Sequence, residues 1–201
     1  MCVGCFSMQK GLLIIISGPS GVGKGTVRRR VMEDDSLNLS YSISMTTRVP
    51  RSKEVDGVDY FFVSNEEFDN NLKNDNFLEW AQFVGNRYGT PKDYVEKLRQ
   101  EGKNVILEIE VEGAKQVLSK CQGNDVFSIF LVPPSYEILE QRMRGRRSEP
   151  EEIIQERLAK ARREMNLKHQ YHYIVLNDRV DRAAEEIKSI IRSKMNAKII
   201  K

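Results

Sequence analysis

A glycine-rich turn that follows an apolar run constrains the fold more than any other feature of this chain. Residues 12–16 read LLIII, residues 18–26 read GPSGVGKGT, and a segment rich in helix-forming residues follows. The spacing Gly18-x-x-x-x-Gly23-Lys24 is that of a phosphate-binding loop between a strand and a helix. In such a loop, backbone N–H groups and the helix dipole converge on phosphate oxygens. The feature therefore predicts an α/β fold with a nucleotide-phosphate site.

We call residues 18–26 the cradle and expect all of them to bind the nucleotide, with the Lys24 ammonium at the β/γ end of the phosphates. The cradle departs from the common motif at one position, since Gly25 stands where a Ser or Thr usually approaches Mg²⁺. Two alternatives remain for the metal, which is held through water or by the hydroxyl of Thr26. The cradle residues are Gly18, Pro19, Ser20, Gly21, Val22, Gly23, Lys24, Gly25 and Thr26.

Further apolar runs predict buried parallel strands at residues 105–109, 126–132 and 173–176. They are almost continuously apolar, as expected when helices cover both faces of a sheet. Ser135 is a predicted N-cap, and Pro150 is a good first residue for a helix that reaches residue 168. The other helices are expected to start at Lys24, Glu112, Tyr136 and Asp181.

The segment between the first two apolar runs has a different pattern, with alternating and aromatic β-prone stretches. Ser64 and Glu67 predict a capping box for a short helix, and Trp80 is expected in an aromatic core. We therefore predict an α/β, P-loop three-layer sandwich with a central parallel sheet and an inserted mostly-β subdomain. The predicted boundaries are residues 10–43, 97–135 and 161–201 for the core, 44–96 for the subdomain and 136–160 for a second, smaller excursion from the core.

Composition limits the setting in which the protein works. The chain has 201 residues, of which 40% are apolar and 30% charged, and no apolar run approaches the ~20 residues of a membrane span. The first ten residues are too short for a secretory signal, and an odd number of cysteines, three, favours a reducing compartment. We therefore expect a soluble, cytoplasmic protein without a membrane partner.

The charge distribution favours small anionic ligands over nucleic acid. The net charge is only +3, which is too small an excess to predict nucleic-acid binding. Positive charge is concentrated instead at residues 48–51 and 142–147. No Asn-Lys-x-Asp sequence is present, so a signalling GTPase is disfavoured.

Two acids, Glu108 and Glu110, end the second apolar run in the sequence VILEIE. Residues two apart on a strand point to the same side, and ligands of α/β sheets bind at the carboxyl ends of the strands. Both carboxylates are therefore expected to face the cradle, where they could share work between magnesium and a ligand edge.

The chain resembles guanylate kinase in several segments that occur in the order of that family. They are SGPSGVGKGT, SISMTTRVPRSKEVDGVDYFFVS, FLEWAQFVGNRYGTP, VILEIEVEGA, RMRGRR and IVLND, and they cover about residues 11–180. The resemblance implies transfer of a phosphoryl group from ATP to GMP, with Mg²⁺ as the cofactor of ATP. It leaves open whether the protein is a monomer or a homo-oligomer.

The resemblance also implies an acceptor site. Arginine forks and phenolic hydroxyls suit the GMP phosphate, and a carboxylate suits the N1–H and 2-amino donors of guanine. Adenine would present a lone pair to that carboxylate, so the site should reject AMP. The resemblance does not decide whether Glu108 binds the substrate or the metal. The implied acceptor residues are Arg48, Arg51, Tyr60 and Tyr88 for the phosphate, Glu79 and Glu110 for the guanine edge, and Ser44 and Thr90 for O6.

The resemblance also implies that residues 136–160 form a short helical lid. For the transfer step, it implies that Arg142, Arg146 and Arg157 act on the moving phosphoryl group together with Lys24. Asn177 matches a residue near the nucleotide. Phosphoryl transfer depends on positioning and charge neutralisation, which arginines supply.

Two other functions are weighed against this one. A non-catalytic module of the same fold would bind protein ligands, but the presence of Lys24, Arg142 and Arg146 disfavours it. A kinase for another acceptor, such as AMP or a ribosyl phosphate, is disfavoured by Glu79 together with the Arg48 and Arg51 pair.

Overall fold

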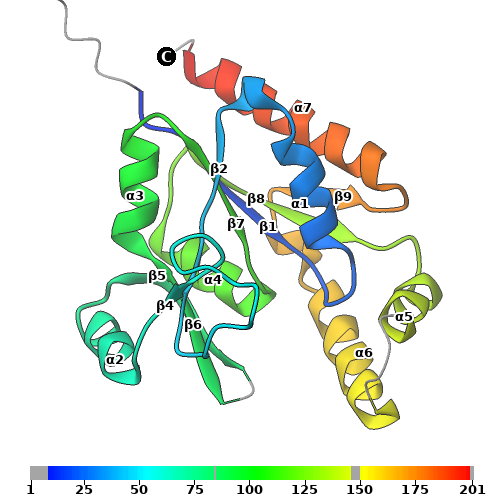
Figure 1. Ribbon diagram of the computed structural model, residues 1–201. Helices are drawn as coiled ribbons and strands as arrows, with labels where there is room; N and C mark the ends of the chain where they lie inside the picture. Colours follow the sequence, from blue (N-terminus) through cyan, green and yellow to red (C-terminus); the bar gives the residue numbers. More distant parts are fainter. Residues whose placement is uncertain (1–8, 84, 146–149, 200–201) are drawn as a thin grey trace, which may run out of the picture.

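The computed structural model describes residues 9–83, 85–145 and 150–199 (Figure 1). Its core is a five-stranded parallel sheet. Four of these strands were predicted from apolar runs and are confirmed. The exception is the first strand in the order, a three-residue edge segment that is too short to show a pattern. In order, the strands are β2 (Leu39–Tyr41), β7 (Asn104–Glu108), β1 (Leu13–Ser17), β8 (Val126–Val132) and β9 (Tyr173–Leu176).

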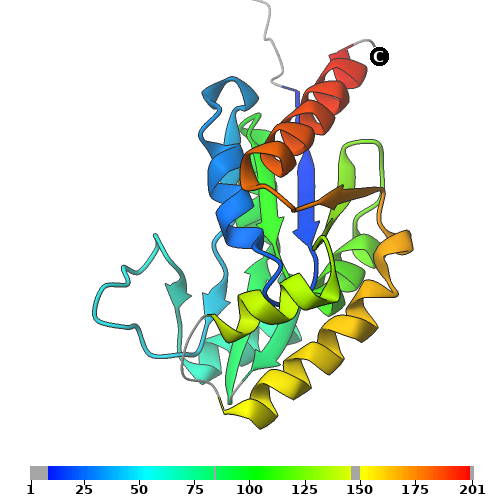
Figure 2. The same cartoon turned by 90° about the vertical axis from the view of Figure 1, so that its right-hand side faces the viewer.

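Helices cover both faces of this sheet, as the apolar strands predict. Helices α1 (Lys24–Met32) and α7 (Val180–Ile199) pack on one face, and α3 (Lys92–Gln100) and α4 (Val111–Lys120) on the other (Figures 1 and 2). Successive side chains of β1 alternate between the two hydrophobic cores, because a strand points them to opposite faces. The predicted three-layer α/β sandwich is confirmed.

A second sheet lies outside the core, in the order β4-β3-β6-β5. The β5–β6 hairpin is antiparallel, and the short helix α2 (Asn65–Lys73) precedes it. Ser64 Oγ accepts a hydrogen bond from the Glu67 N–H at 3.0 Å, which confirms the predicted N-cap. The α3 helix crosses the predicted boundary at residues 96 and 97. The strands are β3 (Met45–Thr46), β4 (Phe61–Phe62), β5 (Phe77–Phe83) and β6 (Asn86–Pro91).

The expectation that Trp80 belongs to an aromatic core is wrong. Its side chain is 36% exposed, and the neighbouring Phe83 is 64% exposed. The aromatic pair that does pack inside is Phe68 of α2 against Phe77 at the start of β5, with ring centroids 4.6 Å apart. The outward half of β5 is therefore a surface of the second sheet.

Helix α5 (Tyr136–Arg144) lies in the predicted lid segment, and α6 (Glu151–Met165) begins in it and continues past its predicted end at residue 160 (Figure 2). Ser135 Oγ accepts from the Ile138 N–H at 3.3 Å, so this predicted cap is also confirmed. The helix predicted to reach residue 168 ends at Met165 and gives way to a 3₁₀ turn, η2 (Lys168–Gln170). Another 3₁₀ turn, η1 (Asp35–Leu37), follows α1. Within the described ranges, no helix is long and apolar enough to cross a bilayer.

Candidate active site

The cradle connects β1 to α1 at the carboxyl edge of the parallel sheet. Gly18 has a φ of 146°, and a Cβ there would lie 2.5 Å from the carbonyl oxygen of Leu131. Gly23, the N-cap of α1, has a φ of 99°, and its Cβ would lie 2.8 Å from Asn177 Nδ2. Both positions require glycine, because a side chain would meet these atoms and strain the backbone. The turn therefore has the shape that the motif predicts.

Lys24 is the first residue of α1, and its side chain folds back over the cradle. Its ammonium donates to the carbonyl oxygens of Gly18 at 2.6 Å and Pro19 at 3.2 Å. Burial lowers the pKa of Lys24, while the negative charge of Glu164 on α6 opposes this shift. The ammonium thus rests on neutral oxygen atoms at the place where phosphates are expected.

A cavity of about 280 Å³ lies beside the cradle and includes Lys24, Glu108 and Glu110 in its wall. The sequence predicted that the two acids lie on one strand, and this prediction is wrong. β7 ends at Glu108, and Glu110 is the N-cap of α4. They still reach the same cavity, because the strand end and the helix start both lie at the carboxyl edge of the sheet.

Glu108 faces the position at which the cradle lacks a hydroxyl. A Cβ on Gly25 would lie 3.3 Å from Glu108 Oε1, while the Nε of Arg28 donates to Glu108 Oε2 at 2.8 Å. Thr26 is exposed on the first turn of α1. Thr26 and Glu108 thus supply oxygen donors of the kind that Mg²⁺ prefers.

Residues of the lid and of the loop after β9 meet at the carbonyl of Val22. The Arg142 guanidinium donates to Val22 O at 3.2 Å and to Asn177 O at 3.0 Å. The Asn177 side-chain amide donates to Val22 O at 2.7 Å. The structure therefore brings two predicted residues, from distant parts of the sequence, against the cradle.

Arg157, another arginine assigned to the transfer step, reaches the cradle from α6. Arg157 donates to Ser20 Oγ at 2.9 Å. One turn further along α6, Lys160 forms an ion pair with Glu110 at 2.6 Å. The sequence reasoning missed Lys160, because nothing in a helical charge pattern shows which partner a lysine will meet. Arg146, the other predicted lid arginine, lies outside the described residues.

The residues predicted to bind the GMP phosphate lie together on the second sheet and on the loop between β3 and β4. The Arg48 guanidinium donates to Glu54 Oε1 at 2.8 Å, and the Arg51 backbone N–H donates to Glu54 Oε2 at 2.8 Å. The ring centroids of Tyr60 and Tyr88 are 6.1 Å apart, and the guanidinium carbon of Arg48 is 5.4 Å from the Tyr60 centroid. The Glu54 carboxylate raises the pKa of Arg48, and the bond to Arg48 lowers the pKa of Glu54. The sequence reasoning missed Glu54, although its place three residues after Arg51 was a signal.

The predicted guanine-edge carboxylate is buried. Glu79 is 7% exposed and accepts a hydrogen bond from Thr90 Oγ1 at 2.5 Å. Burial raises the pKa of Glu79, and the nearby charge of Glu110 raises it further. The Thr90 hydroxyl therefore donates to Glu79 here, and not towards a base. Ser44 is half-buried just before β3, where its carbonyl accepts from the Phe61 N–H at 2.9 Å.

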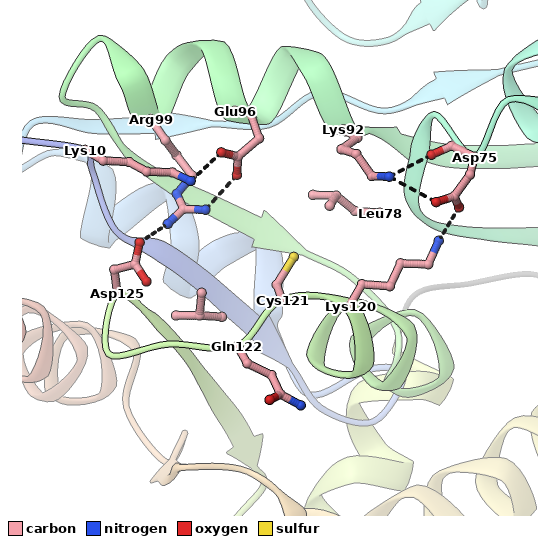
Figure 3. Close-up of a pocket in the computed structure, with 11 residues that line it drawn as sticks. Lys10, Asp75, Leu78, Lys92, Glu96, Arg99, Lys120, Cys121, Gln122 and Asp125 are labelled. Carbon is pink, nitrogen blue, oxygen red and sulfur yellow. Dashed lines mark hydrogen bonds and ion pairs between the residues drawn. The ribbon is translucent and has the colours of Figure 1, made fainter.

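A larger cavity, of about 500 Å³, lies at the opposite, amino-terminal end of the parallel sheet (Figure 3). Its cations are paired with carboxylates. Asp75 accepts from Lys92 at 3.0 Å and from Lys120 at 2.9 Å, and the buried Arg99 contacts Asp125 at 2.5 Å. Each of these cations is thus already paired with a carboxylate, whereas the Lys24 ammonium donates to backbone carbonyl oxygens.

Comparison with known proteins gives one consistent family. The family model described as guanylate kinase matches residues 10–194. The guanylate kinase of Mycoplasma mycoides subsp. mycoides is 55% identical over 184 residues, which are 92% of this chain and 61% of that protein. The guanylate kinase of Bacillus cereus is 55% identical over 183 residues, which are 91% of this chain and 88% of that protein. The chain thus spans less than two thirds of the Mycoplasma relative.

A solved structure shows the same similarity. The crystal structure of guanylate kinase from Anaplasma phagocytophilum superposes with a TM-score of 0.72 at 31% sequence identity. The match covers 92% of this chain and 87% of that one.

Proposed function

The chain belongs to the guanylate kinase family, and we propose that it transfers the γ-phosphoryl group of ATP to GMP, giving ADP and GDP. One observation carries this proposal. Glu110, the N-cap of α4, lines the cradle cavity, and the first turn of that helix contains Gly113, where a Cβ would lie 2.7 Å from the buried Glu79 carboxylate. The start of α4 thus lies next to both the cradle cavity and a carboxylate suited to guanine.

Residues 44–96 bind the acceptor in this proposal. Arg48 and Arg51 hold the GMP phosphate, together with the hydroxyls of Tyr60 and Tyr88, because guanidinium groups bind phosphate in a charge-assisted, bidentate way. The clustering of Arg48 with both tyrosines supports this assignment.

The guanine edge is read by carboxylates. Glu79 and Glu110 accept from N1–H and the 2-amino group, and Ser44 is assigned to O6. Thr90, which the sequence also assigned to O6, donates to Glu79 and so holds that carboxylate. Because Glu79 is buried, a base without these donors leaves a carboxylate unpaired, and such a loss discriminates strongly between ligands.

Transfer depends on positioning and on charge neutralisation by this chain's residues. The cradle N–H groups and Lys24 hold the donor phosphates, and Arg142, Arg146 and Arg157 neutralise the charge that develops on the moving group. Asn177 fixes the wall of the cradle beside the donor nucleotide. Closure of the lid, residues 136–160, excludes water from the phosphoryl group.

The oxygen atoms of Thr26 and Glu108 fit a magnesium ion that arrives with ATP, directly or through water. When bound, Mg²⁺ supplies positive charge to the β- and γ-phosphate oxygens. We propose ATP and GMP as the small-molecule partners and the cytoplasm as the location.

The test is ADP formation from Mg-ATP with GMP, dGMP, AMP, CMP or UMP offered separately. We expect turnover with GMP, alone or together with dGMP. Turnover with AMP would overturn the assignment of the Glu79 edge. Tight binding of GMP without turnover would favour the non-catalytic module instead.

A further inference from the structure

We propose that Gln116 of α4 is a positioning residue that sets the place of Glu79 and so determines how strictly the acceptor site selects guanine. The inference rests on the proposed function. It concerns a side chain that does not line the cradle cavity and whose hydrogen bonds go to the residue next to Glu79.

Gln116 holds the backbone next to Glu79 with two hydrogen bonds. Its Nε2 donates to the carbonyl oxygen of Trp80 at 3.0 Å, and its Oε1 accepts from the Trp80 N–H at 3.1 Å. β5 is an edge strand, so these backbone groups have no neighbouring strand on that side. A side-chain amide carries one donor and one acceptor face side by side and can therefore pair with both groups of a single residue.

The same helix also contacts the carboxylate. Gly113 lies one turn before Gln116, and a Cβ there would lie 2.7 Å from Glu79 Oε2. Residues three apart share a helix face. This face of α4 therefore fixes the strand through Gln116 and leaves space for the carboxylate at Gly113, while Thr90 holds the other carboxylate oxygen.

The N-cap of α4 is Glu110, whose charge raises the pKa of Glu79. One helix therefore sets the separation between the two acids that are assigned to the guanine edge. Guanine presents two adjacent donors, and recognition of such a pair requires carboxylates placed within about 0.5 Å. A loosened β5 edge would misplace Glu79 relative to Glu110.

Gln116 can be removed without dismantling the helix. α4 is attached to the core by Val111, Ala114 and Val117, all essentially buried. Gln116 is half-buried and lies outside this apolar contact. An effect of its substitution on guanine selection would therefore report on position and not on folding.

The experiment compares Gln116→Leu with wild type and with Lys115→Ala, an exposed neighbour on the same helix. We call the two hydrogen bonds between Gln116 and the Trp80 backbone the clamp. Trp80 is the single tryptophan of the chain, so its fluorescence reports GMP binding without turnover. We expect Gln116→Leu to raise Kd and KM for GMP about tenfold, the effect of one or two lost hydrogen bonds. The preference for GMP over IMP, which lacks the 2-amino group, should fall, while KM for ATP stays unchanged.

A second variant separates position from stability. In Gly113→Ala the new methyl group meets the flexible end of Glu79, so the carboxylate shifts and the backbone stays. We expect weaker GMP binding, because the carboxylate is displaced. The melting temperature should not fall, since alanine favours a helix over glycine.

The proposal is overturned if Gln116→Leu keeps the wild-type GMP affinity and GMP-to-IMP preference. It is also overturned if KM for ATP and KM for GMP rise together with a fall in melting temperature, which would indicate a structural role. If wild type binds GMP but does not turn it over, the proposed function fails, and the fluorescence titration still decides the role of Gln116.

Discussion

Two regions of the molecule gather lysine and arginine side chains, and they differ in what those cations contact. In the cradle, Lys24 and Arg142 donate to backbone carbonyl oxygens. In the cavity of Figure 3, Lys92, Lys120 and Arg99 donate to carboxylates as well as to backbone carbonyl oxygens. A carbonyl satisfies the N–H groups and leaves the positive charge in place, whereas a carboxylate cancels it.

The difference shows why the smaller cavity is the active-site candidate. Its volume is about 280 Å³, against about 500 Å³ for the cavity of paired charges. Anion binding depends on convergent N–H groups and on cations that are not already in ion pairs with carboxylates, and volume alone supplies neither. Substitution of a cation should therefore lower turnover in the cradle and leave turnover unchanged in the cavity of paired charges.

The largest effect is expected from Lys24→Met. Loss of a preorganised donor at the transferring group lowers kcat by roughly 10²–10³. Steady-state ADP formation measures it, with circular dichroism as the check on folding. Lys120→Met makes the same change in the cavity of paired charges and should leave kcat at the wild-type value. Equal losses in the two variants would remove the distinction between the regions.

Arg142→Ala comes next, with a loss of about 10² in kcat, the lower end for one lost donor, because other lid cations still neutralise the moving group. Arg142→Lys should recover only part of the rate, since an ammonium lacks the fixed planar set of donors with which the guanidinium contacts Val22 O and Asn177 O. Arg146→Ala tests the same assignment. If Arg142→Ala and Arg146→Ala both retain wild-type turnover, the assignment of the lid arginines is wrong.

Glu79 predicts a pH dependence of GMP binding. GMP donates to the ionised carboxylate, while burial raises the pKa of Glu79 in the free protein. Affinity should therefore fall as pH decreases, beginning above the ordinary carboxyl range of about 4–5. Glu79→Gln should bind GMP about 10–100-fold more weakly at neutral pH, the effect of a lost charge-assisted hydrogen bond.

GMP affinities of wild type and Glu79→Gln are measured by Trp80 fluorescence between about pH 5 and 8, and their difference isolates the effect of Glu79. The phosphate of GMP titrates in the same range but contributes equally to both. Parallel affinity profiles for wild type and Glu79→Gln would show that Glu79 does not read the base.

Contiguous features of the sequence predicted much of this arrangement. The cradle and the caps at Ser64 and Ser135 each depend on residues within a few positions of one another, so their physical causes are visible in the chain itself. Four parallel strands were visible for a similar reason, since their burial makes them continuously apolar.

The remaining features depend on contacts between distant segments, which no local pattern specifies. The clamp of Gln116 on Trp80 joins residues 36 positions apart, and the Lys160 pair with Glu110 joins residues 50 apart. The expected burial of Trp80 was wrong because hydrophobic composition does not tell which half of an edge strand faces the core.

Glu54→Gln should have a smaller, selective effect. Glu54 holds the Arg48 guanidinium and the Arg51 N–H with its two oxygens, so an amide weakens the arrangement of the acceptor loop without removing either arginine. We expect a several-fold rise in KM for GMP with unchanged KM for ATP. Glu66→Gln, an exposed carboxylate on α2, is the matched control. A lower KM for GMP would mean instead that Glu54 competes with the substrate phosphate for Arg48.

The smallest effect is expected from Asp75→Asn, in the cavity of paired charges. Lys120 and Lys92 lower the pKa of Asp75, so any contribution of these ion pairs to stability is present above the ordinary carboxyl pKa and is lost as pH falls through the lowered value. Because all three side chains are exposed, solvent screens the pairs, and thermal melts at neutral pH should change little. Turnover and both KM values should match wild type. A raised KM for GMP would contradict this, since Asp75 lies in the acceptor segment while its lysines lie on α3 and α4. Such a result would mean that paired charges far from the cradle help to hold the acceptor segment against the core.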